Sequence, residues 1–245
     1  MPRFANGETA IYYEEHGSGF PLLLIAPGAM DSAIDLWSGA TINPLDAYSG
    51  DFRLIAMDQR NAGRSTGPLE VADPWGAYAR DQLALLDHLG IQSFHVMGAC
   101  IGSSFALKLI EQAPQRVIAA VLQQPVGITG GNEQLYEAMW RGWADQLARS
   151  RADLDPAQLE AFGTRMRAGD FVLSVSRDFV RNCSTPLLVL PGVDRYHPTA
   201  TGREIAALAS HARLVEPWKD PQHVGVATVA VREFLTAHTP LSLGT

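Results

Sequence analysis

The chain alternates short apolar runs with longer amphipathic stretches. The run Leu22–Ala26 has no polar positions, which is typical of a strand covered on both faces. The stretch Tyr78–Leu89 has helical apolar spacing and is followed by Gly90, a residue that often ends helices. Strands are predicted at 8–15, 21–26, 52–57, 93–97, 117–123, 186–190 and 212–216, and helices at 78–89, 101–113, 201–210 and 224–238. This order predicts an α/β fold with a mostly parallel sheet flanked by helices.

Two segments depart from this alternation. Residues 16–19 read His-Gly-Ser-Gly and predict a hairpin turn between the first two strands. Residues 126–182 contain no predicted strand and favour helices near 133–149, 156–167 and 171–181. The first of these helices carries two apolar stripes, one with Leu135, Met139, Trp143 and Leu147, the other with Tyr136 and Trp140. Either the stripes simply pack on the sheet, or the segment is a lid whose aromatic residues line a pocket.

The tightest predicted turn joins the strand at 93–97 to the helix at 101–113. A strand that reverses into a helix within three residues forces the central residue, Cys100, into a sparsely populated backbone conformation. Gly98 and Gly102 would let the strand and helix approach each other. At a helix N-terminus, free N–H groups and the helix dipole favour the thiolate form of Cys100. A small buried cysteine in an ordinary turn is the alternative interpretation.

The G-x-C-x-G pattern around Cys100 resembles the nucleophile elbow of the alpha/beta-hydrolase superfamily, with cysteine in the usual place of serine. The cysteine elbow is similar to that of dienelactone hydrolase. In the superfamily the nucleophile is followed by an acid and then a histidine. Here Asp194 follows in L-V-L-P-G-V-D-R-Y-H-P, and His223 stands before the last predicted helix. The resemblance therefore implies a Cys100, His223 and Asp194 triad.

The same resemblance covers nearly the whole chain and implies its domain organisation. It implies an alpha/beta-hydrolase core at 1–125 and 183–245, with a small helical lid inserted at 126–182. Some members carry the acid one strand earlier, but Gln123-Gln124-Pro125 offers no carboxylate there. Asp220 is expected on the same loop as His223. His197 could contact substrate, although we expect a structural role for it.

The resemblance also implies two backbone N–H groups that stabilise an oxyanion. One is that of Ile101, and the other is that of Ala29 in the turn Pro27-Gly28-Ala29-Met30. Because Pro27 replaces the usual histidine of this turn, Met30 is an alternative donor. We expect Met30, Trp140 and Trp143 to line the substrate pocket.

Another loop, residues 58–65, resembles the superfamily's D-x-R-G-x-G-x-S segment. Asn61 stands where the first glycine usually lies. We interpret this loop as a turn held by Asp58 and Arg60, although it could also shape the floor of the active site. Cys183, the second cysteine, precedes a buried strand and is expected in the core.

Composition narrows the function further. The 245 residues are 47% hydrophobic, which suits one sizeable core, and the net charge of −7 argues against a general affinity for nucleic acid or anionic membranes. No apolar run has the length of a signal peptide or membrane span, so we expect a cytoplasmic protein. Two cysteines and unpaired histidines favour neither a disulfide framework nor a metal, and no cofactor is expected. The sequence leaves open whether the protein is a monomer or a homodimer.

These features predict an enzyme with a small-molecule substrate. The primary hypothesis is a hydrolase of a small, fairly apolar ester, lactone or thioester that acts through a covalent thioester on Cys100. One alternative is an acyltransferase that uses the same triad. The other is a ligand-binding module of hydrolase fold with little turnover, since fold alone does not establish function.

Overall fold

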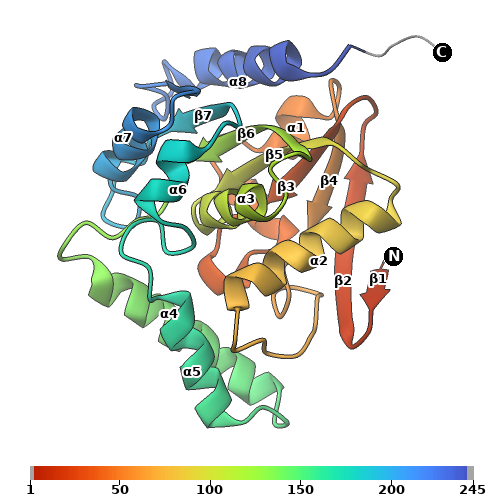
Figure 1. Ribbon diagram of the computed structural model, residues 1–245, viewed down its shortest axis with the longest axis vertical. Coiled ribbons are helices and arrows are strands. Elements are labelled where there is room, and N and C mark those ends of the chain that lie inside the picture. Colours follow the sequence, from red (N-terminus) through yellow and green to blue (C-terminus); the bar gives the residue numbers. More distant parts are fainter. Residues whose placement is uncertain (1–2, 242–245) are drawn as a thin grey trace.

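The computed structural model describes residues 3–241 and contains an eight-stranded sheet (Figure 1). The strand order is β1-β2-β4-β3-β5-β6-β7-β8. The strands are β1 (Arg3–Asn6), β2 (Thr9–His16), β3 (Pro21–Ile25), β4 (Arg53–Met57), β5 (Phe94–Ala99), β6 (Val117–Gln123), β7 (Leu187–Leu190) and β8 (Ala212–Leu214). The pairs β1/β2 and β2/β4 are antiparallel and the other neighbouring pairs are parallel. The predicted mostly parallel α/β fold is confirmed.

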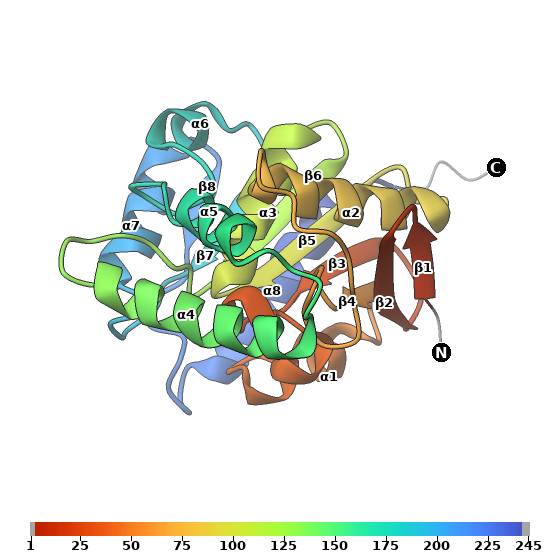
Figure 2. The same ribbon diagram turned by 90° about the horizontal axis from the view of Figure 1, so that it is seen from below.

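Helices cover both faces of this sheet (Figures 1 and 2). They are α1 (Pro44–Tyr48), α2 (Pro74–His88), α3 (Ile101–Gln112), α4 (Glu133–Ser150), α5 (Pro156–Met166), α6 (Arg177–Asn182), α7 (Thr199–Leu208) and α8 (Val224–His238), with short 3-10 helices η1 (Ala29–Asp31) and η2 (Ile34–Gly39). Apolar side chains of α2 and α3 form one core cluster with the sheet, and those of α1 and α8 form a second. The parallel strands are therefore buried on both faces, which explains their continuous apolar runs.

The predicted hairpin at residues 16–19 is wrong. Strand β4 lies between β2 and β3, so the two strands that this turn connects are not neighbours in the sheet. Gly17, with φ of 72°, packs against the chain that enters β4, and a Cβ there would lie 2.1 Å from the carbonyl oxygen of Ser49. The turn therefore carries the chain across β4. A glycine pair predicts a tight turn but does not fix which strand lies beside it.

The segment 126–182 forms α4, α5 and α6 between β6 and β7. Figure 1 shows α4 and α5 together at the lower end of the molecule, outside the sheet. The third predicted helix, at 171–181, begins only at Arg177. Leu173 has φ of 69°, which an α-helix cannot accommodate, and Phe171, Val172 and Leu173 are buried in the core instead. Ser176 then caps α6 by accepting a hydrogen bond from the N–H of Phe179 (3.1 Å).

Candidate active site

Parallel register brings four loops to one edge of the sheet. Strand β5 ends beside β3 on one side and β6 on the other, with Gly98 opposite Ile25 and Ala99 opposite Gln123. Gln123 in turn lies opposite Leu190, the last residue of β7. The loops that follow β3, β5, β6 and β7 therefore leave the sheet side by side. This edge, at the carboxyl ends of the strands, is where open α/β sheets usually bind ligands.

Cys100 stands at this edge, in the turn from β5 into α3. Its φ of 58° and ψ of −122° are strained for a non-glycine residue, as the sequence predicts. A Cβ on Gly98 would lie 2.1 Å from the carbonyl oxygen of Gly102, and a Cβ on Gly102 would lie 2.1 Å from that of Ile25. Both glycines are therefore needed for the turn to form. The Cys100 side chain is buried, with 6% of its surface exposed.

The loop between β7 and α7 carries both a carboxylate and an imidazole. Asp194 Oδ1 accepts hydrogen bonds from the backbone N–H groups of Tyr196 and His197, each at 2.9 Å. His197 Nδ1 lies 2.9 Å from Asp194 Oδ1 and 3.1 Å from Oδ2. A carboxylate partner fixes the proton of the neutral ring on Nδ1 and leaves Nε2 as the free nitrogen. This Nε2 is buried and has no nitrogen or oxygen partner within residues 3–241.

The group that interacts with the His197 ring on that side is the Cys100 thiol. Burial opposes ionisation of the thiol, but hydrogen bonding and charge from His197 outweigh it, so the pKa of Cys100 is lowered. Burial also opposes the charged form of His197, yet its interactions with Cys100 and Asp194 raise the pKa of the ring. Both directions favour a thiolate beside an imidazolium. Burial would raise the pKa of Asp194, but the hydrogen bond from His197 lowers it below its ordinary value, so the carboxyl stays ionised.

The structure does not support the predicted role of His223 and places His197 beside the thiol instead. His223 Nδ1 lies 2.8 Å from both carboxylate oxygens of Asp220, and the side chain is 42% exposed. The loop after β8 instead turns Trp218 inward, where its indole N–H donates to the carbonyl oxygen of Pro191 (2.6 Å). Lys219 of the same loop lies 3.6 Å from Asp194 Oδ2. This loop therefore supports the Asp194 loop with a tryptophan and a lysine, while its histidine stays at the surface.

The backbone N–H groups of Gly28 and Ile101 help to lower the pKa of the Cys100 thiol. Ile101 is also one of the two oxyanion donors that the sequence analysis expects. Ala29, the other expected donor, follows Gly28, opens η1 and has φ of 53°. Gly28 itself has φ of 116°, so the turn bends sharply at both residues. Gly28 therefore joins Ala29 and Met30 as a candidate for the second donor.

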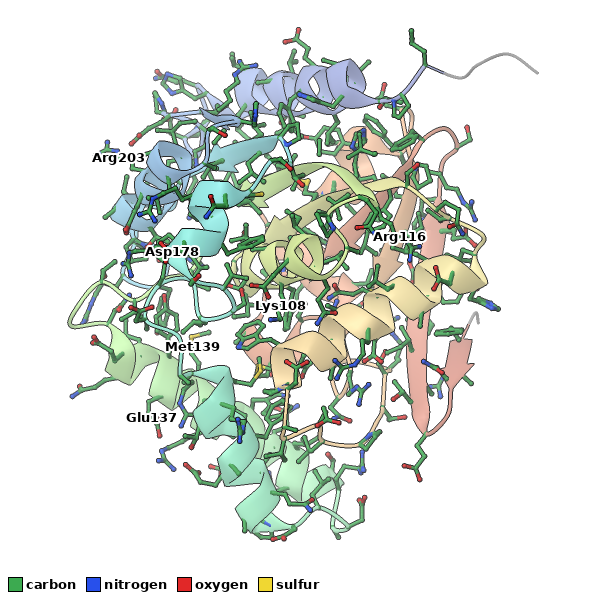
Figure 3. All side chains as sticks on the ribbon, viewed as in Figure 1. Lys108, Arg116, Glu137, Met139, Asp178 and Arg203 are labelled. Atoms are coloured by element: carbon green, nitrogen blue, oxygen red, sulfur yellow. The ribbon has the colours of Figure 1, made fainter. Side chains whose placement is uncertain are left out.

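An apolar cavity of about 40 Å³ lies between η1, the start of α3 and α4. Ala29, Met30, Ile101 and Trp140 are among the residues that line it, together with Met139. In Figure 3, Met139 lies on the side of α4 that faces the rest of the molecule. Trp143, which we expect in the substrate pocket together with Met30 and Trp140, does not line this cavity. Its ring packs 5.1 Å from that of Trp140 and borders a different, larger cavity.

Tyr136 of α4 ties the 126–182 segment to the loop that carries His197. Its hydroxyl donates to the carbonyl oxygen of Tyr196 (2.7 Å) and accepts from the N–H of Gly127 (3.1 Å). Asn132, which precedes α4, donates to the carbonyl oxygens of Gly127 (2.9 Å) and Arg195 (3.4 Å). These contacts hold the two residues adjacent to His197 and Asp194 in place. Sequence analysis assigned Tyr136 only to an apolar stripe, because a buried tyrosine on a helix gives no sign of its hydroxyl's partner.

The loop at 58–65 is organised as predicted around Asp58. Its Oδ1 accepts from the N–H of Ile34 and its Oδ2 from the N–H of Arg64, both at 2.8 Å. Arg60 takes no part in this arrangement, because its guanidinium pairs with Asp81 through two hydrogen bonds of 2.7 Å. Asn61 adopts φ of 60°, the conformation for which glycine is usual at this position.

Residues 3–241 contain no group of three or more His, Cys, Asp or Glu side chains placed to hold a metal ion. None of the helices in this range is both long and apolar enough to cross a membrane.

The chain is similar in sequence to a known protein family and to several hydrolases. The family model described as alpha/beta hydrolase fold matches residues 21–205. An N-formylmaleamate deformylase of Pseudomonas putida is 24% identical over 220 residues, which cover 87% of this chain and 79% of that protein. A 2-hydroxymuconate semialdehyde hydrolase of Pseudomonas putida is 31% identical over 147 residues, covering 58% of this chain and 48% of the relative. With several further relatives the match likewise spans less than half of the relative's own length.

Solved structures agree in fold. A meta-cleavage product hydrolase from Pseudomonas fluorescens has a TM-score of 0.71 at 22% identity, with 94% of this chain and 96% of that one covered. The enol-lactonase from Burkholderia xenovorans has a TM-score of 0.68 at 22% identity, with 96% and 100% covered. At these identities the likeness shows the fold alone.

Proposed function

Because the chain belongs to the alpha/beta-hydrolase family, we propose that it is a hydrolase in which Cys100 is the nucleophile. His197 acts as base and then as acid, and Asp194 orients the ring. The observation that carries this proposal is that the strained turn at Cys100 and the loop with the hydrogen-bonded Asp194 and His197 pair leave the sheet at the same edge. The directions of the pKa shifts support it, since His197 lowers the pKa of the buried thiol and Cys100 raises the pKa of the ring. Thiolates are the reactive form of cysteine, so this site has an activated nucleophile without a metal or cofactor.

The proposed reaction has two steps. The Cys100 thiolate attacks the acyl carbon, and the tetrahedral oxyanion receives hydrogen bonds from the N–H groups of Gly28 and Ile101. The intermediate collapses to a thioester as His197 gives its proton to the leaving group. His197 then takes a proton from a water molecule, which attacks the thioester and releases the acid and the thiolate. Removing one oxyanion donor from a hydrolase raises the activation free energy by about 3 kcal/mol. The turns at Gly28 and Cys100, which position the two proposed donors, are therefore important for the rate.

We propose that the 126–182 segment acts as a lid and that the acyl group is short and apolar. Met30, Met139 and Trp140 border the small cavity beside Ile101, whose N–H faces the sulfur. The similar proteins include a deformylase, an enol-lactonase and a semialdehyde hydrolase. They support hydrolysis as the reaction, but they do not indicate which type of bond is hydrolysed. An ester, lactone or thioester with a short apolar acyl chain fits this site.

A substrate panel tests the proposal. Aryl esters, lactones and acyl thioesters of increasing acyl length are incubated with the protein, and intact mass spectrometry is used to look for an acyl adduct on Cys100. Many turnovers per protein with a transient Cys100 adduct are the expected result. A permanent adduct without turnover would point to a binding module, and an added alcohol or thiol that outcompetes water would point to acyl transfer.

The pH dependence of Cys100 alkylation provides a second prediction. A lowered thiol pKa means that the thiolate persists at lower pH and is lost only as the pH falls through that value. Iodoacetamide should therefore alkylate Cys100 with a half-maximal rate at a lower pH than it alkylates a free cysteine. Cys183 is an internal comparison, because burial raises the pKa of its thiol. Peptide mass spectrometry separates the two sites, and a Cys100 profile like that of a free thiol would contradict the proposed ion pair.

Tyr136→Phe gives a third prediction. Removing the hydroxyl deletes the hydrogen bond to the Tyr196 carbonyl and loosens the loop that carries His197. We expect kcat to fall roughly tenfold, since small misplacement of a catalytic group is costly. The alkylation profile of Cys100 should also move to higher pH. Tyr48→Phe is the matched control, because the buried Tyr48 hydroxyl contacts a backbone carbonyl of α8 far along the chain, that of Thr228 (3.3 Å). A fall in stability without a shift in the alkylation profile would assign Tyr136 a purely structural role.

A further inference from the structure

A second cavity lies under the C-terminal half of α4, next to the proposed active site. Its volume is about 360 Å³, which is within the range of small-molecule sites. Its walls come from η1, the 58–65 loop and α4, and include Asp31, Asn61, Trp143 and Arg151. The 3-10 helix η1 borders both cavities: Ala29 and Met30 line the apolar cavity, and Asp31 lines this one. A ligand that fills the second cavity would therefore lie close to the turn whose Gly28 N–H faces the Cys100 sulfur.

The cavity contains a carboxylate without a counter-ion. No hydrogen bond or ion pair recorded within residues 3–241 involves the carboxylate of Asp31, which is half-buried. Burial alone accounts for the raised pKa of Asp31, so no nearby cation offsets it. Withdrawing a carboxylate from water without a partner costs free energy. A ligand that brings a positive charge or strong N–H donors to Asp31 would recover that cost.

Arg151, a cation in the cavity wall, already forms an ion pair with another acid. The guanidinium of Arg151 donates to both carboxylate oxygens of Asp153, at 2.8 Å each. Its Nη1 also lies 3.4 Å from Asn61 Oδ1 and from the Gly67 carbonyl oxygen. Asn61 Oδ1 accepts a second hydrogen bond from the N–H of Gly67 (3.0 Å). Asn61, which stands where the family usually has glycine, therefore contacts Arg151 in this wall, and the guanidinium of Arg151 already has Asp153 as its partner.

The remaining wall offers oxygen acceptors. Thr66 and Gln146 are among the residues that line the cavity, and hydroxyl and amide oxygens accept hydrogen bonds from ammonium N–H groups. Trp143 also borders the cavity, but it is only 3% exposed and packs against Trp140 and Phe162, whose ring centroids lie 5.1 Å and 5.9 Å away. A carboxylate with oxygen acceptors beside it in a cavity of this size forms a suitable site for an organic amine.

We propose that this cavity binds an organic ammonium group of the substrate, with Asp31 as its counter-ion. The inference rests on the proposed function in that it names the polar part of the substrate. The apolar acyl part would occupy the cavity beside Ile101, and the ammonium part would occupy the cavity that Asp31 lines. The substrate class is then an amine-bearing ester, lactone or thioester.

Binding of a matched pair of probes tests this proposal. Phenethylammonium and 2-phenylethanol have nearly the same shape and differ in charge. Calorimetry on the Cys100→Ala variant should show that the ammonium binds at least tenfold more tightly than the alcohol. Equal affinity for the two probes would overturn the proposal, and this comparison requires no change at Asp31.

Variants at two acids locate the site. Asp31→Asn should remove the preference for the ammonium, whereas Asp35→Asn should retain it, because Asp35 is exposed and pairs with Arg64. Persistence of the preference in Asp31→Asn would also overturn the proposal. Since these titrations need no turnover, a protein that binds the amine but hydrolyses no ester contradicts only the proposed function. One that hydrolyses neutral esters and ignores the amine contradicts only this inference.

Discussion

Cys100→Ala is expected to abolish the acyl-enzyme and to lower kcat/KM by on the order of 10⁴-fold or more, because the variant has no nucleophile at the proposed site. The thiol lies in a strained turn, faces the N–H groups of Gly28 and Ile101, and interacts with His197. An alanine fits the same backbone without a new clash, so the fold should be kept. Rates on the best substrate of the panel, together with intact mass after a rapid quench, measure the effect.

Cys183→Ala is the matched control for this prediction. Cys183 is also buried, but it follows α6 and its sulfur contacts only the carbonyl oxygen of Thr185, at 3.9 Å. Its replacement should leave turnover and the acyl adduct unchanged. Undiminished activity in Cys100→Ala, or an adduct that maps to Cys183, would reject Cys100 as the nucleophile.

The elements that the sequence predicts best are those fixed by local pattern. Strand β6 and helix α8 have the predicted bounds. A continuous apolar run followed by Pro125 defines β6, and helical apolar spacing defines α8. The turn at Cys100 follows from two glycines at a strand-to-helix junction. By contrast, which strand pairs with β2 is decided by packing between residues far apart in sequence. The turn at 16–19 does not indicate that this neighbour is β4.

The identity of the histidine beside the thiol is the main point that the sequence left undetermined. The spacing Asp-x-x-His occurs twice, at Asp194/His197 and at Asp220/His223, and both pairs follow a strand of the core. In each pair the ring contacts the carboxylate three residues earlier. Which loop reaches Cys100 is decided by long-range contacts, including that of Tyr136 with the Tyr196 carbonyl. No local pattern records such a contact.

The lining of the pocket was undetermined for a related reason. Trp140 and Trp143 are three residues apart on α4, and both are buried. Yet Trp140 borders the apolar cavity and Trp143 borders the larger one. Periodicity predicts which face of a helix is apolar, but not which cavity each side chain on that face meets.

His197→Asn is expected to lower kcat/KM by on the order of 10³-fold, within the range of 10²- to 10⁴-fold that general acid–base catalysis contributes. The variant removes the ring that takes and returns the proton, and it also removes the positive charge that lowers the pKa of the thiol. The alkylation of Cys100 should therefore shift to higher pH at the same time. Steady-state rates and the pH profile of alkylation are measured on the same preparations.

His223→Asn is the matched control, since His223 forms the same contact with an aspartate three residues earlier but lies at the surface. An exposed pair of this kind contributes little to stability. Its loss should change kcat/KM by no more than about twofold and leave the alkylation profile unchanged, since a group remote from the reacting atoms adds nothing to acid–base catalysis. The opposite result, with His223→Asn inactive and His197→Asn active, would restore the family order of nucleophile, acid and late histidine. It would also require the loop after β8 to turn His223 from the surface toward Cys100 during turnover.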